Sequence, residues 1–355
     1  MADRIKVLVV GCGNMGKSHA RAYHKLDNFE IVGLVSRNPE SRNQLSEELG
    51  GYPTFESLES AFKKVTVQAV SVNTYPDSHY DLVLRALQAG CHVFVEKPLA
   101  LTVPDAEHLV SVAREKQLKL VVGYILRVHP AWSKFISIAQ TLGKPLVMRM
   151  NLNQQSDSKQ WYTHKQLMQS MSPIVDCGVH YVDVMCMMTR AKPISVSTIG
   201  ARLSDEIAED MYNYGQLQVR FDDGSVGWYE AGWGPMMSET AFFIKDVIGP
   251  KGSVSIQDKP KSDSQEIEGH TKTGSLRLHH SQLDKNGCFE KKDDIISTDD
   301  EPDHDGLCML EQLYFLRAIL ENRCLDDILK DAVNSLRIVL AADESFKSGQ
   351  TIMLQ

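Results

Sequence analysis

The stretch IKVLVVGCGNMG, residues 5–16, decides how the first part of the chain folds. Its apolar half predicts a short buried strand, and its glycines form the pattern GxGxxG directly before an amphipathic helix. In such a unit the first glycine permits a tight turn, the second lets the backbone approach a diphosphate, and the third lets the helix pack closely on the strand. Free amides at the start of the helix bind the phosphates. The stretch therefore predicts a dinucleotide site, with a glycine turn that binds no ligand as the alternative. The predicted phosphate-binding residues are Gly11, Gly13, Asn14, Met15 and Gly16.

Short apolar strands continue to alternate with amphipathic helices up to residue 123. This alternation predicts βαβ units and an α/β Rossmann domain with a doubly wound parallel sheet, over residues 1–123. The predicted strands are Ile5–Val10, Glu30–Val35, Val67–Asn73, His92–Glu96 and Lys119–Gly123. The predicted helices are Met15–Leu26, Pro39–Leu49, Leu58–Lys64, His79–Ala89 and Pro104–Lys116.

After residue 124 the strands become longer and follow one another without intervening helices. This pattern predicts an α+β second domain over residues 124–355 with a large, mostly antiparallel sheet. The predicted strands are Leu146–Leu152, Ile194–Arg202, Tyr212–Phe221, Ser225–Ala231 and Ala241–Ile248, with a hairpin turn at 222–224 and further sheet excursions and loops over 257–305. The predicted helices are Ala131–Leu142, one beginning near Pro173, Leu310–Leu320 and Asp331–Glu344, with a polar loop before Pro173.

The composition and net charge of the chain indicate which kind of binding partner to expect. The 355 residues are 43% hydrophobic and 24% charged, which suits two ordinary soluble domains. The net charge of −8 argues against nucleic acid or an anionic membrane and favours a small molecule. The chain has no apolar run long enough for a signal peptide or a membrane helix. Its seven cysteines form no CxxC pair, so we expect a cytoplasmic protein without a metal site.

Ser36 and Arg37 follow the second predicted strand, where a dinucleotide-binding domain contacts the adenosine ribose. An acidic residue at this position selects NAD, whereas a hydroxyl and a guanidinium can bind the 2′-phosphate of NADP. We therefore expect NADP to be favoured. If Arg37 is solvated or stacks on the adenine, the protein accepts both cofactors.

Lys97 follows the fourth predicted strand, at the end of the sheet where ligands bind. A lysine at a strand end is usually a solvated charge, but here Glu96 precedes it and Pro98 constrains the backbone after it. The neighbouring strand supplies Asn73, Thr74 and His79, which could line the nicotinamide part of the same site. Lys97 is thus a candidate catalytic, cofactor-binding and substrate-binding residue.

Asp176 and His180 form a second candidate pair. In a helix, residues four apart share a face, so a carboxylate there can orient an imidazole, although such a pair also serves purely structural purposes. Together with Lys97 and a nicotinamide, the pair would supply the base that takes the hydroxyl proton while the carbon loses hydride.

These residues resemble the glucose-fructose oxidoreductase / inositol dehydrogenase / MocA (Gfo/Idh/MocA) family of NAD(P)-dependent dehydrogenases. The resemblance extends over nearly the whole chain. It rests on Gly11–Gly16, Thr74 with His79, Glu96-Lys97-Pro98, Gly123-Tyr124 with Arg127 and Pro130, and Asp176-x-Gly178-x-His180-x-x-Asp183.

The resemblance implies hydride transfer at a secondary alcohol of a sugar, sugar derivative or cyclitol. It implies proton transfer by Lys97 and His180, with Asp176 binding substrate or orienting the histidine. It also places Glu96 and Arg127 with the cofactor and Tyr124 with the substrate, and it implies a homodimer or homotetramer built on the open face of the sheet.

Two departures from the family pattern stand out. Tyr75 lies between Thr74 and Pro76, and the segment 172–175 has the sequence SPIV where relatives often carry glycines. Trp161, Tyr162 and His164 could contact substrate, or the aromatic residues could simply pack. Two other functions remain open: a sensor that binds the cofactor without catalysis, and a redox-neutral glycosidase with tightly held NAD.

Overall fold

The computed structural model describes all residues except 1–3, 239–242, 258–272, 300 and 355. Its backbone divides into two units, residues 1–128 with 302–333, and residues 129–301 with 334–355. The predicted α/β Rossmann domain and α+β second domain are both confirmed. This division differs from the one expected at 123/124 in two ways: it falls after residue 128, and residues 302–333 belong to the first unit.

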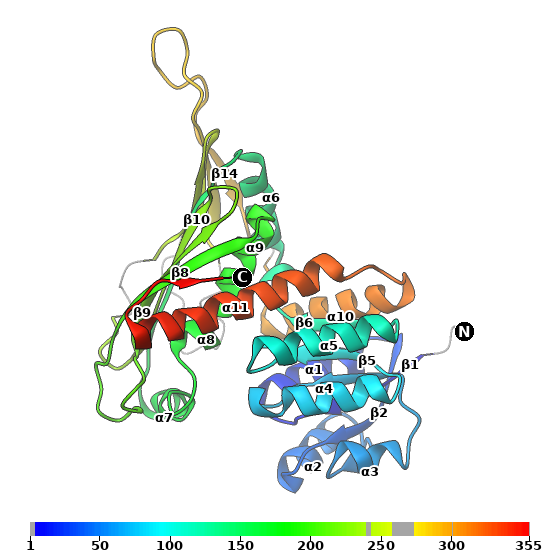
Figure 1. Ribbon diagram of the computed structural model, residues 1–355. Helices are drawn as coiled ribbons and strands as arrows, with labels where there is room; N and C mark the ends of the chain where they lie inside the picture. The colour runs from blue at the N-terminus through cyan, green and yellow to red at the C-terminus, as the bar shows by residue number, and fades with distance from the viewer. Residues whose placement is uncertain (1–3, 239–242, 258–272, 300, 355) are drawn as a thin grey trace. The chain divides into compact units, whose positions relative to one another are not determined.

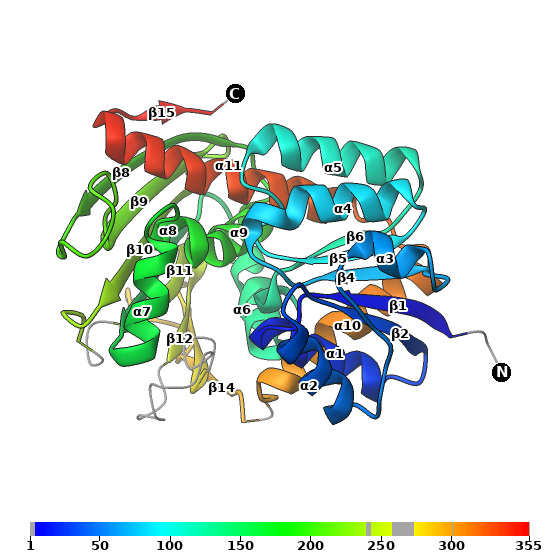
Figure 2. The ribbon, with the colours of Figure 1, turned by 90° about the horizontal axis from the view of Figure 1, so that it is seen from below.

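The first unit is a parallel six-stranded sheet in the order β3-β2-β1-β4-β5-β6. Its helices cover both faces, and Figure 2 shows α4 and α5 on one face with α1 and α10 on the other. The strands are β1 (Ile5–Val10), β2 (Phe29–Val35), β3 (Thr54–Phe55), β4 (Ala69–Val72), β5 (His92–Glu96) and β6 (Leu120–Gly123). The helices are α1 (Asn14–Lys25), α2 (Pro39–Glu48), α3 (Leu58–Phe62), α4 (His79–Gln88), α5 (Val103–Glu115) and α10 (His304–Leu320), with short 3₁₀ turns η1 (Pro76–Ser78) and η2 (Ile125–Arg127).

Aromatic packing explains why α10 belongs to the first unit. Phe315 of α10 is fully buried, and its ring lies 6.3 Å from that of Phe29 and 6.2 Å from that of Phe94. Phe29 begins β2 and Phe94 lies in β5, so α10 covers the sheet of the first unit although more than 200 residues of sequence separate them.

The second unit contains a nine-stranded sheet in the order β14-β13-β12-β11-β7-β10-β9-β8-β15. All its pairings are antiparallel except β7 with β10, so the sheet is mixed but mostly antiparallel, and Figure 1 shows α9 beside it. The strands are β7 (Val147–Gln155), β8 (Pro193–Ala201), β9 (Tyr214–Phe221), β10 (Val226–Gly234), β11 (Lys245–Gly249), β12 (Gly252–Gln257), β13 (Ser275–His280), β14 (Asp294–Ser297) and β15 (Ile352–Met353). The helices are α6 (Pro130–Thr141), α7 (Ser158–Leu167), α8 (Pro173–Asp176), α9 (Gly178–Thr189) and α11 (Asp326–Ser348), and the division between the units falls within α11.

Several expected details were wrong. The polar loop before Pro173 contains the helix α7, whose buried residues are only Trp161 and His164, so its apolar periodicity is too weak to detect. The strand expected at Ala241–Ile248 begins at Lys245, and its first two residues lie outside the described ones. Part of the segment expected at 257–305 likewise lies outside them, and the rest forms β13 and β14.

No helix in the described ranges is both long and apolar enough to cross a bilayer.

Candidate active site

The glycine loop after β1 has no room for side chains at its first and third glycines. Gly11 has φ +93°, and a Cβ built on it would lie 2.3 Å from the carbonyl oxygen of Asn73. A Cβ on Gly16 would lie 1.9 Å from the carbonyl oxygen of Gly11. Gly13 is different, because no atom lies within 4 Å of its built Cβ. The loop is therefore closely packed underneath and open above Gly13, as a diphosphate requires.

The N-terminus of α1 is free to bind an anion. Gly13 is its N-cap, and neither a side-chain cap nor an acidic residue is present in its first turn. The free amides at Asn14 and Met15 and the positive end of the helix dipole face the same region. These residues fit the diphosphate of a dinucleotide.

Three side chains surround the end of β2. Ser36 is half-buried and Arg37 is exposed. Arg42 of α2, which the sequence reasoning missed, donates from Nη1 to the Ser36 carbonyl at 2.7 Å, while its Nε is buried without a hydrogen-bond partner in the described chain. Burial raises the pKa of the Cys12 thiol in the glycine loop to about 11, and the positive charge of the nearby Arg42 opposes this rise. Two guanidiniums are thus available at the predicted ribose end.

Asn73 and His79 brace loops at the carboxyl end of the sheet. The Asn73 side chain donates to the Ser71 carbonyl at 3.1 Å and accepts from the Ser71 hydroxyl at 3.1 Å. His79 is fully buried, with Nδ1 2.7 Å from the carbonyl oxygen of Pro98 and Nε2 3.0 Å from that of Thr74. Burial lowers the pKa of His79, while the two carbonyl oxygens oppose this shift, because the ring can donate to both of them only when it is protonated. His79 therefore holds the loop after β4 to the loop after β5, and its predicted contact with the cofactor stays a prediction.

Glu96 is buried within a chain of hydrogen bonds that reaches α10. Its Oε1 lies 2.8 Å from His19 Nε2, and His19 Nδ1 lies 2.8 Å from the amide nitrogen of Gln312. The hydroxyl of Tyr23 donates to the amide oxygen of Gln312 at 2.5 Å, and the amide nitrogen faces His19. The amide nitrogen must then donate to Nδ1, so His19 carries its proton on Nε2 and donates it to Glu96.

The ionised Glu96 in turn holds the backbone of Lys97. Burial by itself raises the pKa of Glu96, but the hydrogen bond from His19 and the charge of Lys97 outweigh it and leave the pKa below its usual value. The second carboxylate oxygen accepts the backbone N–H of Lys97 at 3.2 Å. The half-buried Lys97 thus starts from a fixed backbone at the carboxyl end of β5, and the Lys97–Pro98 peptide is cis.

Within the described residues, His19, Cys308 and Glu311 are the one group of three whose potential metal-ligand atoms lie within 4.8 Å of one another. Both ring nitrogens of His19 already make the hydrogen bonds described above. The arrangement therefore supports a role in the Glu96 network rather than metal binding.

Arg127 and Tyr124 lie just after β6. The Arg127 guanidinium is 3.4 Å from the carboxylate of Asp331 in α11, and both side chains are almost fully buried. The guanidinium also lies 5.8 Å from the centre of the buried Tyr124 ring. Arg127 thus ties α11 to the end of β6, and the expected contacts of Arg127 with cofactor and of Tyr124 with substrate stay predictions.

Asp176 and His180 lie on two consecutive helices of the second unit rather than one. Asp176 ends α8, Cys177 joins it to α9, and the amide of His180 bonds the Cys177 carbonyl at 3.2 Å, which breaks the regular helix. Gly178 allows this junction to approach the sheet, since a Cβ there would lie 2.8 Å from the Tyr229 ring. Both candidate side chains are half-buried.

The start of α8 is anchored by α11. Ser172 caps α8 and donates to Asp343 at 2.7 Å, and the Tyr212 hydroxyl donates to the same carboxylate oxygen at 2.6 Å. Burial raises the pKa of Asp343, and these two hydrogen bonds oppose it. The segment 172–175, where the sequence departs from the family pattern, is therefore rigidly held without glycines.

Trp161 packs in an apolar cluster with Met168, Ile207, Met211 and Trp233. Its indole N–H donates to Glu206 at 3.2 Å. This position favours the packing role over the substrate contact that was the other expectation.

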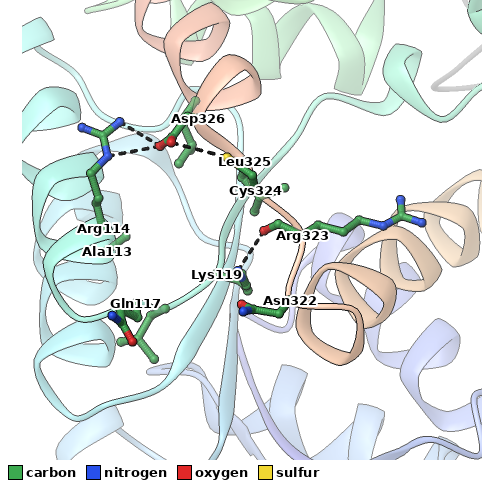
Figure 3. Close-up of a pocket in the computed structure, with 11 residues that line it drawn as sticks. Ala113, Arg114, Gln117, Lys119, Asn322, Arg323, Cys324, Leu325 and Asp326 are labelled. Atoms are coloured by element: carbon green, nitrogen blue, oxygen red, sulfur yellow. Dashed lines mark hydrogen bonds and ion pairs between the residues drawn. The ribbon is translucent and has the colours of Figure 1, made fainter.

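A pocket of about 390 Å³ lies between α5 and the junction of α10 with α11, near Lys119 at the amino end of β6. Figure 3 shows contacts among the residues that line it: Arg114 donates to Asp326 at 2.9 Å and Lys119 donates to the Arg323 carbonyl at 2.8 Å. The glycine loop, Ser36 and Lys97 follow the carboxyl ends of their strands. The pocket is therefore not part of the candidate active site.

Comparison with known families agrees with this geometry. Residues 5–124 match the description "Oxidoreductase family, NAD-binding Rossmann fold", and residues 137–255 match the GFO/IDH/MocA C-terminal domain. The two matches cover more than half of the chain. The chain belongs to the GFO/IDH/MocA family. This GFO/IDH/MocA protein is an NAD(P)-binding oxidoreductase.

Two full-length relatives come from Bacillus subtilis (strain 168). The chain is 25% identical to scyllo-inositol 2-dehydrogenase (NAD(+)), covering 100% of this chain and 97% of that enzyme. It is 24% identical to scyllo-inositol 2-dehydrogenase (NADP(+)), covering 99% of this chain and 97% of that enzyme. The chain is also 28% identical to the UDP-N-acetylglucosamine 3-dehydrogenase of Acidithiobacillus ferrooxidans over a shorter alignment. This alignment covers 54% of this chain and 56%, or about half, of that enzyme.

Among solved structures, the myo-inositol 2-dehydrogenase of Lactobacillus plantarum superposes with a TM-score of 0.80 at 16% identity, covering 99% of this chain and 100% of that one. At this identity the likeness shows that this GFO/IDH/MocA protein shares the fold.

Proposed function

We propose that this oxidoreductase transfers hydride between a nicotinamide cofactor and a secondary alcohol or ketone of a sugar, sugar derivative or cyclitol. The observation that carries the proposal is the position of Lys97, which follows β5 at the same end of the sheet as the glycine loop and is held there through Glu96. The names of the full-length relatives support a cyclitol or sugar as the substrate class.

In the proposed reaction, His180 takes the hydroxyl proton as general base, and Lys97 donates a hydrogen bond to the reacting oxygen and shares its proton. Asp176 orients His180 or binds a substrate hydroxyl. The nicotinamide, when bound, accepts the hydride from the carbon. In the reverse direction, the same side chains return the proton to the ketone oxygen.

A substrate panel tests this function. Purified protein is incubated with NAD or NADP and with myo-inositol, scyllo-inositol, D-glucose or UDP-N-acetylglucosamine, and nicotinamide absorbance is followed. Turnover of at least one alcohol supports the proposal. Bound cofactor with no turnover of these alcohols or their ketones would favour the sensor function. Cleavage of a glycoside with cofactor that never exchanges would favour the redox-neutral glycosidase.

We further propose that NADP is the preferred cofactor. The Ser36 hydroxyl and the Arg37 and Arg42 guanidiniums supply hydrogen bonds and positive charge suited to a 2′-phosphate. Relatives of both cofactor types match this chain with nearly equal identity, so the preference rests on these side chains.

We expect replacement of Ser36 by aspartate and of Arg37 by alanine each to lower kcat/KM for NADP about tenfold or more, because each removes or opposes a charge-assisted hydrogen bond to the 2′-phosphate. The aspartate variant should also improve use of NAD, since a carboxylate binds the free ribose hydroxyls. Arg220→Ala, an exposed arginine on β9, serves as the matched control. An unchanged NADP/NAD ratio in both variants would contradict the preference.

We infer a homo-oligomer from the uncovered face of the nine-stranded sheet. Three isoleucines of this unit are exposed, Ile199 on β8, Ile248 on β11 and Ile295 on β14, with exposed fractions of 67%, 39% and 63%. Exposed apolar residues spread across such a face suit contact with a second copy. A particle mass of 39.8 kDa in sedimentation would show a monomer and end this inference.

We also propose that the protein works in the reducing cytoplasm. All seven cysteines lie in described parts of the chain, and none of them forms a disulfide. Fractionation of cells with a specific antibody would test the location.

A further inference from the structure

A polar cluster beside Asp176 in the second unit is not used by the proposed proton transfer. Gln154 lies near the end of β7, Trp233 lies near the end of β10, and His164 lies on α7. Cys177, next to Asp176, connects them to the candidate catalytic residues: its sulfur lies 3.7 Å from Gln154 Oε1 and 3.6 Å from Asp176 Oδ2.

The orientation of the Gln154 amide is fixed by Trp233. The indole Nε1 lies 2.7 Å from the amide and can only donate a hydrogen bond, so the amide atom that faces it is the oxygen. The amide nitrogen therefore points away from the indole, and its two N–H groups have no protein acceptor in the described chain. Gln154 is half-buried, which leaves these donors accessible to a ligand.

His164 is held in one orientation by the same tryptophan. Its ring stacks on Trp233 with centroids 4.3 Å apart and planes 11° from parallel. Only 8% of the residue is exposed, and Nδ1 is buried without a hydrogen-bond partner in the described chain. A buried N–H without an acceptor is costlier than a lone pair without a donor, so the single proton of the neutral ring belongs on Nε2.

The charge state of His164 is also defined. Burial lowers its pKa to about 4, although the nearby carboxylate of Asp176 opposes this. At neutral pH His164 therefore presents an uncharged Nε2–H donor close to a carboxylate acceptor. This arrangement suits a neutral hydroxylated ligand and gives no ionic attraction to an anion.

We propose that Gln154 and His164, aligned by Trp233, form a subsite for a second hydroxyl of the substrate, distinct from the hydroxyl that is oxidised. The amide and imidazole donate to the oxygen of this hydroxyl, and Asp176 can accept its proton in a hydrogen bond. The subsite recognises a polyhydroxylated ring rather than a simple alcohol. It rests on the proposed function and specifies how the substrate is chosen.

Two variants remove the proposed donors with little change in volume. Gln154→Leu deletes the amide, and His164→Phe keeps a ring that can stack on Trp233. The control is Gln166→Leu, an exposed glutamine on the same helix as His164. The probes are the panel compound with the highest kcat/KM and its monodeoxy analogues; for myo-inositol these are the quercitols. NADPH binding and the melting temperature are recorded for each variant to confirm that it is folded.

We expect each variant to raise KM for the parent compound about 10- to 100-fold with kcat changed less than threefold, because the hydroxyl is bound equally in ground state and transition state. One deoxy analogue, which lacks the second hydroxyl, should be used equally well by wild type and variants. A structural defect would instead penalise parent and all analogues alike.

The possible failures are separable. Unchanged KM in both variants, or an equal penalty for parent and every analogue, overturns the subsite while wild-type turnover upholds the proposed function. Absence of wild-type turnover with the whole panel overturns the proposed function and the subsite together. If His164→Phe does not fold, Gln154→Leu on its separate strand decides the question.

Discussion

Replacement of Lys97 by methionine is expected to lower kcat about 10²- to 10⁴-fold while leaving NADP binding intact. Methionine keeps an unbranched side chain of similar length but lacks the ammonium that donates to the reacting oxygen and shares its proton. The backbone at this position is held by Glu96 through the Lys97 amide, which the substitution does not remove. The loop should therefore keep its shape, and the loss should appear in kcat rather than in cofactor affinity.

The measurement is steady-state turnover of the best panel substrate, with NADP affinity followed separately by protein fluorescence. Lys63→Met, at an exposed lysine after α3, is the matched control and should behave like wild type. A Lys97→Met enzyme with turnover within a few-fold of wild type would remove Lys97 from the mechanism. A variant that also loses NADP binding would point to a role in the cofactor site instead.

Much of the first unit could be predicted from local sequence because its signals are local. The glycine loop combines three glycines with a preceding apolar strand, and the structure gives Gly11 and Gly16 the close backbone contacts that this pattern implies. Burial on both faces makes the parallel strands continuously apolar, so β1 and β5 were predicted with their observed bounds.

Contacts between residues far apart in the sequence could not be predicted from such local patterns. Nothing near Gln312 in the sequence indicates that its amide meets His19 and Tyr23, or that Phe315 covers the first sheet. Arg42 was missed for a related reason: it lies on α2 with the spacing of a solvated helix residue, and only the fold turns its guanidinium back to Ser36.

The second unit was harder because its helices carry weak patterns. α7 buries only Trp161 and His164, so its polar sequence resembles a loop. The pair Asp176 and His180 was predicted from a four-residue spacing on one helix, yet the structure places the end of α8 and the start of α9 between them. The motif identified the residues, but it gives no sign of the break at Cys177, beside which Gly178 packs against the Tyr229 ring.

Replacement of His180 by alanine is expected to reduce kcat about 10²- to 10⁴-fold, the usual contribution of a general base. Asp176→Asn should cost less, because it disturbs the orientation of the imidazole without removing it. If Asp176 acts through His180, the double variant should be no slower than His180→Ala alone, since residues that act as a unit have strongly non-additive effects.

Added imidazole provides the sharpest readout for His180. A small base that enters the space left by the side chain should restore part of the activity of His180→Ala in proportion to its concentration, whereas a purely structural histidine would not be replaced in this way. His108→Ala, at an exposed histidine on α5, should neither lose activity nor respond to imidazole. If the losses caused by Asp176→Asn and His180→Ala are fully additive, the carboxylate has an independent role, such as direct binding of a substrate hydroxyl. If His180→Ala keeps near-wild-type turnover, a different residue must act as the base.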